Sequence, residues 1–186
     1  MRTRALLLLL FTLAVSIVVS SCTRQEEKKP EMKKLVVVAT LFPLYDMARY
    51  IGADKADVSL LLPPGVEPHS FEPTPADVVR INEADIFVYT GKFMEPWAGN
   101  VIKGVTNKNL VVVDASRGAK MVPGVFRDKD EPAGALDPHI WLDPVICMKI
   151  VERIAGAFSA ADPANASFYR KNAAAYTARL AALDRE

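Results

Sequence analysis

The sequence is poor in histidine and cysteine, with two of each in 186 residues. It holds no C-x-x-C pair, which excludes a zinc site built from paired cysteine thiolates. The glycine-rich loops G-x-G-x-x-G and G-x-x-x-x-G-K-[ST] are missing, as are the G-x-S-x-G turn and the H-E-x-x-H helix. The chain therefore lacks the common motifs for nucleotide binding and for hydrolysis.

The sequence also has no large excess of positive or negative charge. The 23 lysines and arginines are balanced by 22 aspartates and glutamates, so the net charge is +1. A nucleic-acid-binding domain usually carries a basic surface, and this balance argues against one. After residue 22 no apolar run reaches the roughly 20 residues of a membrane-spanning helix. With 51% hydrophobic and 24% charged residues, the composition is that of a globular protein.

The first 34 residues read as a leader and a tether. Arg2 and Arg4 precede an apolar run from Ala5 to Val19, which predicts a signal peptide over residues 1–21. The run ends in VSSC, and small residues before a cysteine resemble a bacterial lipobox, which implies lipidation of Cys22. Ordinary cleavage nearby, leaving a free thiol, is the alternative. Residues 23–34 are polar and aperiodic, so residues 22–34 are expected to form a lipidated flexible tether.

Apolar β-branched runs then alternate with helical patterns. Strands are expected at 35–40, 57–63, 85–91 and 110–116, and helices at 43–52, 75–84, 96–105 and 144–161, with a last helix after Asp162 and Pro163. Strands separated by single helices imply right-handed βαβ units. The predicted fold class is therefore α/β, with a four-stranded parallel sheet flanked by helices.

Two helix starts carry specific signals. Thr74, Pro75 and Asp77 have the spacing of a capping box with proline in the first turn. Asp143 before Pro144 predicts a second N-cap. In the helix that follows, Cys147 shares a face with Val151, Ile154 and Phe158, so it is expected to be a small core residue. The last helix carries an apolar stripe at spacings of three and four, namely Tyr169, Ala173, Tyr176, Leu180 and Leu183.

Each histidine lies in a loop that is rich in proline. His69 follows the second expected strand in PPGVEPHSFEPTP, and His139 lies beyond the fourth in LDPHIWLDP. In open α/β sheets, ligands bind at the carboxyl ends of the strands, so both imidazoles are expected at that edge. Imidazole is a good ligand for transition metals, which makes the pair a candidate metal site. Two unrelated histidines with ordinary hydrogen bonds are the alternative.

Three segments carry a family resemblance. LFPLYDMARYIG, LLPPGVEPHSFEPTPADVVRINEADIFVYTG and DPHIWLDP resemble the signature segments of the zinc/manganese solute-binding lipoproteins of ABC importers, the ZnuA/TroA-like group (cluster A-I). The resemblance covers nearly all of 35–186. It implies that 35–162 form the N-terminal lobe, that 163–186 begin the helix between two lobes, and that the C-terminal lobe is absent here. It also implies that His69 and His139 are ligands of Zn2+ or Mn2+, completed by residues of the other lobe.

The resemblance implies a non-enzymatic role outside the cytoplasm. The membrane-anchored lipoprotein would capture a divalent metal and deliver it to a permease in the cytoplasmic membrane. An adhesin-like surface lipoprotein without transport activity is one alternative. A hydrolase with an open zinc position and Glu72 as third ligand is another. The loop before His139 contains no histidine, unlike that of many zinc-specific relatives, which mildly disfavours a dedicated zinc scavenger.

Three carboxylates lie beside the histidines in the sequence. Glu67 and Glu72 flank His69, and Asp137 precedes His139 by two residues. A carboxylate that accepts a hydrogen bond from an imidazole orients the ring, so each of the three is a candidate for holding its neighbouring histidine in place behind the metal. Solvated, capping or turn-forming roles are the alternatives for these side chains.

Overall fold

A computed structural model describes residues 33–124 and 136–186. The signal peptide, the lipidated Cys22 and most of the tether, all expected from the sequence, lie outside the described residues. Among the helices of the described ranges, none is both long and apolar enough to cross a membrane.

Four parallel strands form the sheet, as the sequence predicts. They are β1 (Leu35–Ala39), β2 (Ala56–Leu60), β3 (Ile86–Tyr89) and β4 (Val111–Asp114), in the spatial order β2-β1-β3-β4. The strands are shorter than predicted at their carboxyl ends, because the chain turns away there into the loops that follow. Because β2 and β4 are the outer strands, each of the two histidines lies in a segment that follows an outer strand.

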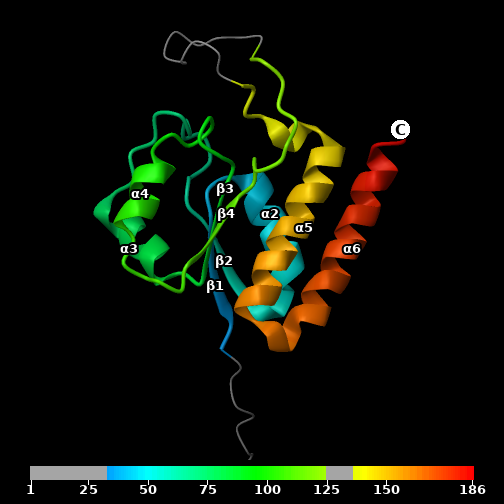
Figure 1. The fold of residues 1–186 in the computed structure, drawn as a ribbon, viewed down its shortest axis with the longest axis horizontal. Helices are drawn as coiled ribbons and strands as arrows, with labels where there is room; N and C mark the ends of the chain where they lie inside the picture. Colours follow the sequence, from blue (N-terminus) through cyan, green and yellow to red (C-terminus); the bar gives the residue numbers. More distant parts are fainter. Residues whose placement is uncertain (1–32, 125–135) are drawn as a thin grey trace, which may run out of the picture. The chain divides into compact units, whose positions relative to one another are not determined.

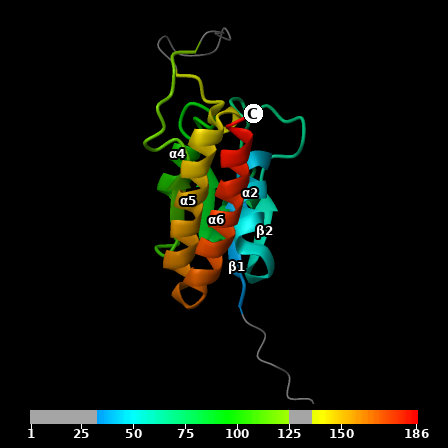
Figure 2. The same ribbon diagram turned by 90° about the vertical axis from the view of Figure 1, so that its right-hand side faces the viewer.

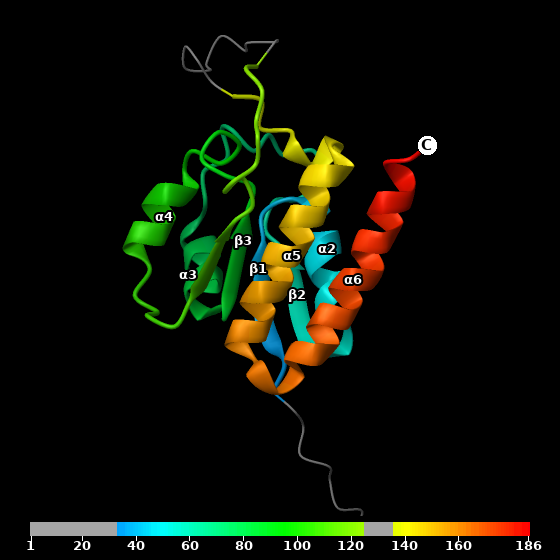
Figure 3. The ribbon, with the colours of Figure 1, turned by 45° about the vertical axis from the view of Figure 1, so that its right-hand side comes forward.

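Helices cover both faces of this sheet (Figures 1 and 3). On one face lie α2 (Phe42–Gly52), α5 (Pro144–Ala161) and α6 (Ala166–Leu183), and on the other lie α3 (Pro75–Glu83) and α4 (Ala98–Gly104). Short 3-10 turns occur at Ala53–Lys55, Ile140–Leu142 and Pro163–Asn165. The helix expected over 96–105 begins only at Ala98, and the last helix follows the turn at Pro163. The α/β fold class is confirmed.

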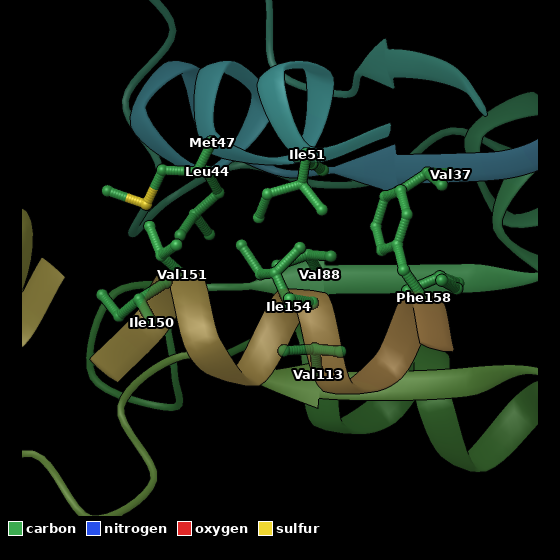
Figure 4. Close-up of a cluster of buried hydrophobic side chains, with 14 of the residues drawn as sticks. Val37, Leu44, Met47, Ile51, Val88, Val113, Ile150, Val151, Ile154 and Phe158 are labelled. Atoms are coloured by element: carbon green, nitrogen blue, oxygen red, sulfur yellow. The ribbon is translucent and has the colours of Figure 1, made fainter. Parts of the chain in front are cut away.

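Alternation along the strands divides the core into two clusters. Val37 and Val88 point toward α2 and α5, whereas Val38 and Phe87 point toward α3 and α4. Both pairs are fully buried, because a strand in the middle of a parallel sheet is covered on both faces. Figure 4 shows the larger cluster, in which apolar side chains of α2 and α5 meet those of the strands. The carboxyl ends of the strands, from which the histidine loops begin, are therefore supported by packed apolar side chains.

The predicted helix caps are present. The Thr74 hydroxyl accepts a hydrogen bond from the Asp77 backbone N–H, and the Asp77 carboxylate accepts one from the Thr74 backbone N–H, which completes a capping box. Asp143 accepts hydrogen bonds from the backbone N–H groups of Val145 and Ile146. The second cap, Asp143, lies four residues after His139 and fixes the start of α5 at Pro144.

The last helix packs along α5 and α2 (Figure 2). Tyr169 and Ala173 of the predicted stripe are buried, while Leu183 is 56% exposed. The Tyr176 hydroxyl donates to the Asp46 carboxylate at 3.1 Å, which ties α6 to α2. The amino-terminal half of α6 thus belongs to the core of this unit.

Candidate metal centre

Both histidines line one cavity at the carboxyl end of the sheet. The cavity has a volume of about 630 Å³ and is open to solvent. Its wall is formed by the loops after β1, β2 and β3 and by the segment before α5, which lie at the same end of the sheet in Figure 1. The lining residues are Leu41, Phe42, Pro43, Leu60, Leu62, Pro63, Pro64, Gly65, Val66, Glu67, Pro68, His69, Met94, His139 and Trp141. Two imidazoles therefore face an otherwise largely apolar hollow.

His69 is held in a loop with unusual backbone geometry. Gly65 has φ +83, a conformation that a residue with a side chain rarely adopts, so glycine suits this turn. The Glu67 carboxylate accepts a hydrogen bond from the His69 backbone N–H at 3.2 Å, while the distance from the same oxygen to His69 Nε2 is 3.9 Å. Glu67 therefore contacts the backbone of His69 more closely than its ring. Glu72 is exposed and does not line the cavity.

His139 has a carboxylate bound to its ring. Asp137 Oδ1 lies 2.8 Å from His139 Nδ1 and also accepts the His139 backbone N–H at 2.9 Å. The hydrogen bond from the His139 backbone N–H, followed by the one from the ring, holds the pKa of Asp137 below its usual range. An ionised carboxylate at Nδ1 favours a proton on that nitrogen, which leaves the lone pair of the neutral ring on Nε2. Nε2 is therefore the nitrogen available to a metal.

Two further contacts fix the His139 loop. The Asp137 backbone N–H donates to the Val122 carbonyl at 2.8 Å, which attaches the segment before His139 to the chain beyond β4. Trp141 packs edge-on against the imidazole, with ring centroids 5.3 Å apart. The side chain of His139 nevertheless remains 48% exposed, so its free nitrogen is within reach of solvent.

A buried carboxylate joins the two central strands behind the cavity. Glu95 is fully buried and accepts hydrogen bonds from the Thr40 hydroxyl at 2.6 Å, the Thr90 backbone N–H at 3.1 Å and the Gly91 backbone N–H at 3.0 Å. Burial raises the pKa of Glu95. Gly91 has φ +146, and a Cβ there would lie 2.5 Å from the Ser116 hydroxyl oxygen, so only glycine fits. Glu95 therefore locks the ends of β1 and β3 together, next to Met94 in the cavity wall.

The expected site residues separate into three groups. His69, His139 and Glu67 line the cavity, Asp137 binds the ring of His139 from outside it, and Glu72 takes part in neither arrangement. Within the described residues, no group of three or more His, Cys, Asp and Glu is placed to hold a metal ion. The described part of the chain thus supplies two imidazoles as candidate ligands.

Neither Glu95 nor the contact of Trp97 with the loop of His69 was predicted from the sequence, although Trp97 was expected to pack in the core or at the lobe interface, and it does pack against the core. A signal existed for the first, because Glu95 is a lone charge in the segment GKFMEPWAG directly after an apolar strand. Nothing in the sequence shows that the Trp97 indole reaches the loop of His69. The interpretation of Cys147 as a core residue is confirmed, since it is buried and its burial raises the pKa of the thiol to about 11.

Comparisons with known proteins place this cavity in context. The family model for the zinc-uptake complex component A, periplasmic (ZnuA), matches residues 37–186. The high-affinity zinc uptake system protein ZnuA of Bacillus subtilis is 39% identical over 159 residues, which cover 82% of this chain. The metal-dependent lipoprotein YcdH of Bacillus subtilis superposes with a TM-score of 0.74 at 41% identity over 82% of the chain. Zn(II)-bound AdcA of Streptococcus pneumoniae gives 0.73 at 35% identity over 82%.

The match covers only part of each relative. The chain spans 50% of the Bacillus zinc uptake protein, 54% of YcdH and 32% of AdcA. The family model nevertheless matches most of the chain, and the four parallel strands with their two-sided helix cover fit the superposed structures. The chain therefore belongs to the ZnuA family of zinc-uptake complex A components.

Proposed function

We propose that this chain is the metal-capturing part of the solute-binding protein of an ABC importer, and that His69 and His139 bind the metal as cargo. The observation that carries the proposal is that the only two histidines of the chain line one cavity although 69 residues separate them. The named relatives are zinc-uptake and zinc-binding proteins, which favours Zn2+.

The chemistry of the donors supports zinc as the cargo. Neutral imidazole nitrogens suit Zn2+, whereas Mn2+ prefers more oxygen ligands, so Mn2+ is the second choice. The carboxylate of Asp137 would raise the basicity of His139 and keep Nε2 free for the metal. A zinc site usually has about four ligands, and the remaining ones would come from the second lobe that the family resemblance implies.

The proposal includes a place outside the cytoplasm. Cys22 would carry a lipid that anchors the protein to the membrane, and the tether of residues 23–34 would let the metal-binding lobe reach a permease. The relative AdcA of Streptococcus pneumoniae is named a zinc-binding lipoprotein, which supports the anchor. No catalytic role is proposed, because a hydrolase would need a third protein ligand, and Glu72 lies outside the cavity.

Nuclear magnetic resonance of the imidazole nitrogens tests this function. With two histidines in the chain, the spectrum holds two imidazole spin systems, one for each candidate ligand. Titration with Zn2+ is expected to shift both, and His69→Ala or His139→Ala is expected to weaken binding at least about tenfold. Glu83→Gln, which removes an exposed carboxylate on α3, is the control and leaves the affinity unchanged. Imidazole signals that stay in place throughout the titration would overturn the proposal.

A further inference from the structure

Trp97 contacts the loop of His69 on both sides of the histidine. Its indole Nε1–H donates to the carbonyl of Pro68 at 3.0 Å. Its ring packs against Phe71 in an edge-on arrangement, with centroids 5.2 Å apart and an interplanar angle of 64°. One contact lies one residue before His69 and the other two residues after it. The Trp97 side chain therefore holds the short segment around His69 from both sides. The orientation of this segment determines whether the imidazole faces the cavity.

Backbone hydrogen bonds give the loop little support in this stretch. Val66 donates to the Pro63 carbonyl at 3.2 Å, and the next backbone–backbone hydrogen bond along the chain starts the helix at Thr74. For residues 67–73, no backbone–backbone hydrogen bond occurs within the described parts of the chain. The side-chain bond from Glu67 to the His69 backbone is local, since both partners belong to the same loop. The contacts with Trp97, together with the packing of Phe71 on the core cluster beneath α3 and α4, therefore connect this segment to the rest of the fold.

Trp97 is itself fixed to the sheet. It directly precedes α4, and the Glu95 carbonyl accepts the backbone N–H of Ala98 at 3.1 Å. Glu95 is bound to the ends of β1 and β3 through its buried carboxylate. The indole ring packs against the core cluster that lies between the sheet and α3 and α4. A continuous series of contacts therefore runs from the central strands through Glu95 and Trp97 to Pro68.

We propose that Trp97 is a positioning residue for His69. Its N–H holds the Pro68 carbonyl and its ring holds Phe71, so the imidazole faces the cavity before any metal arrives. Preorganised ligands bind more tightly, because less conformational entropy is lost on binding. The inference rests on the proposed function to the extent that His69 is a metal ligand. The placement of the loop by Trp97 is independent of the metal.

Trp97→Phe tests the indole hydrogen bond. The variant keeps an aromatic ring for Phe71 and removes the donor to Pro68. We expect faster hydrogen exchange of the amides around His69 and an altered imidazole spectrum in the metal-free protein. Zn2+ binding is expected to weaken about threefold to tenfold, which corresponds to one neutral hydrogen bond. The control is Tyr176→Phe, which removes one hydroxyl hydrogen bond on α6 and leaves the amides around His69 and the zinc affinity unchanged.

A double-mutant cycle separates positioning from general stability. In a His69→Ala background, Trp97→Phe is expected to cause no further loss of the residual zinc binding through His139. Equal losses with and without His69 would overturn the proposal, as would unchanged exchange rates around His69. If Trp97→Phe does not fold, as judged by circular dichroism, Phe71→Leu removes the second contact and is expected to act in the same direction. Should the wild-type protein bind no zinc, the proposed function fails, while the metal-free exchange data still decide the role of Trp97.

Discussion

Glu95→Ala should strongly destabilise the protein, although Glu95 is not a candidate metal ligand. The substitution leaves three buried groups without their partner, namely the Thr40 hydroxyl and the backbone N–H groups of Thr90 and Gly91. A buried polar group that loses its hydrogen bond costs about 1–3 kcal/mol. Water entering the space left by the side chain would recover part of this loss. The expected decrease in the free energy of unfolding is therefore about 3 kcal/mol, near the low end of the summed penalties.

A loss of that size is measurable. Domains of ordinary size have a free energy of unfolding of about 5–15 kcal/mol, so the variant would fold but with a much lower urea midpoint. Urea unfolding followed by far-ultraviolet circular dichroism measures the difference. A decrease below about 1 kcal/mol would refute the reasoning, because it would mean that the three groups find other partners at little cost.

The pH dependence gives an independent check on Glu95. Burial raises the pKa of Glu95 in the folded state above the ordinary value of 4.5. The folded state then binds the proton more tightly than the unfolded state. The resulting stability is fully present below pH 4.5 and is lost as the pH rises through the raised pKa. Glu95→Gln lacks this titration, so its stability relative to wild type should improve as the pH rises from 4.5. Parallel pH profiles for the two proteins would contradict the assignment.

Three further predictions concern the site and the core. Asp137→Ala should weaken zinc binding about tenfold in a calorimetric titration, because His139 loses the partner of Nδ1, and an unchanged affinity would contradict this. Phe158→Ala should lower the free energy of unfolding by about 3–5 kcal/mol in urea, because Phe158 is fully buried in the larger core cluster; a loss under 1 kcal/mol would argue against that packing. The 186-residue chain alone should bind Zn2+ only weakly, since two imidazoles fall short of about four ligands, and nanomolar affinity in calorimetry would disprove this.

Much of the fold could be predicted because local signals and topology agree. The β-branched run at Leu35 and the capping box at Thr74 each determine one element, and strand–helix alternation then requires a parallel sheet. The carboxyl-edge rule brings the two histidine loops together without any knowledge of distances. It could therefore be predicted from the sequence that His69 and His139 line the same cavity.

The contacts that support the site could not be predicted from the sequence. The bond from Trp97 to Pro68 joins residues 29 positions apart, and that between Glu95 and Thr40 joins residues 55 apart. Neither pair leaves a periodic pattern, because each depends on how two loops approach each other after the sheet has formed. Closeness in the sequence is no guide either, since Glu72 follows His69 by three residues but its side chain is exposed and does not line the cavity.

The strand order has a thermodynamic consequence. His69 follows one outer strand and His139 lies beyond the other, so an ion held by both would tie together opposite margins of the sheet. Such a link closes a loop of about 70 residues, which restricts the unfolded chain in the way a long-range cross-link does. Zinc binding and stability would then be coupled by mass action, so the melting temperature would rise with the zinc concentration. The zinc-bound chain would thus resist unfolding and proteolysis better than the metal-free chain.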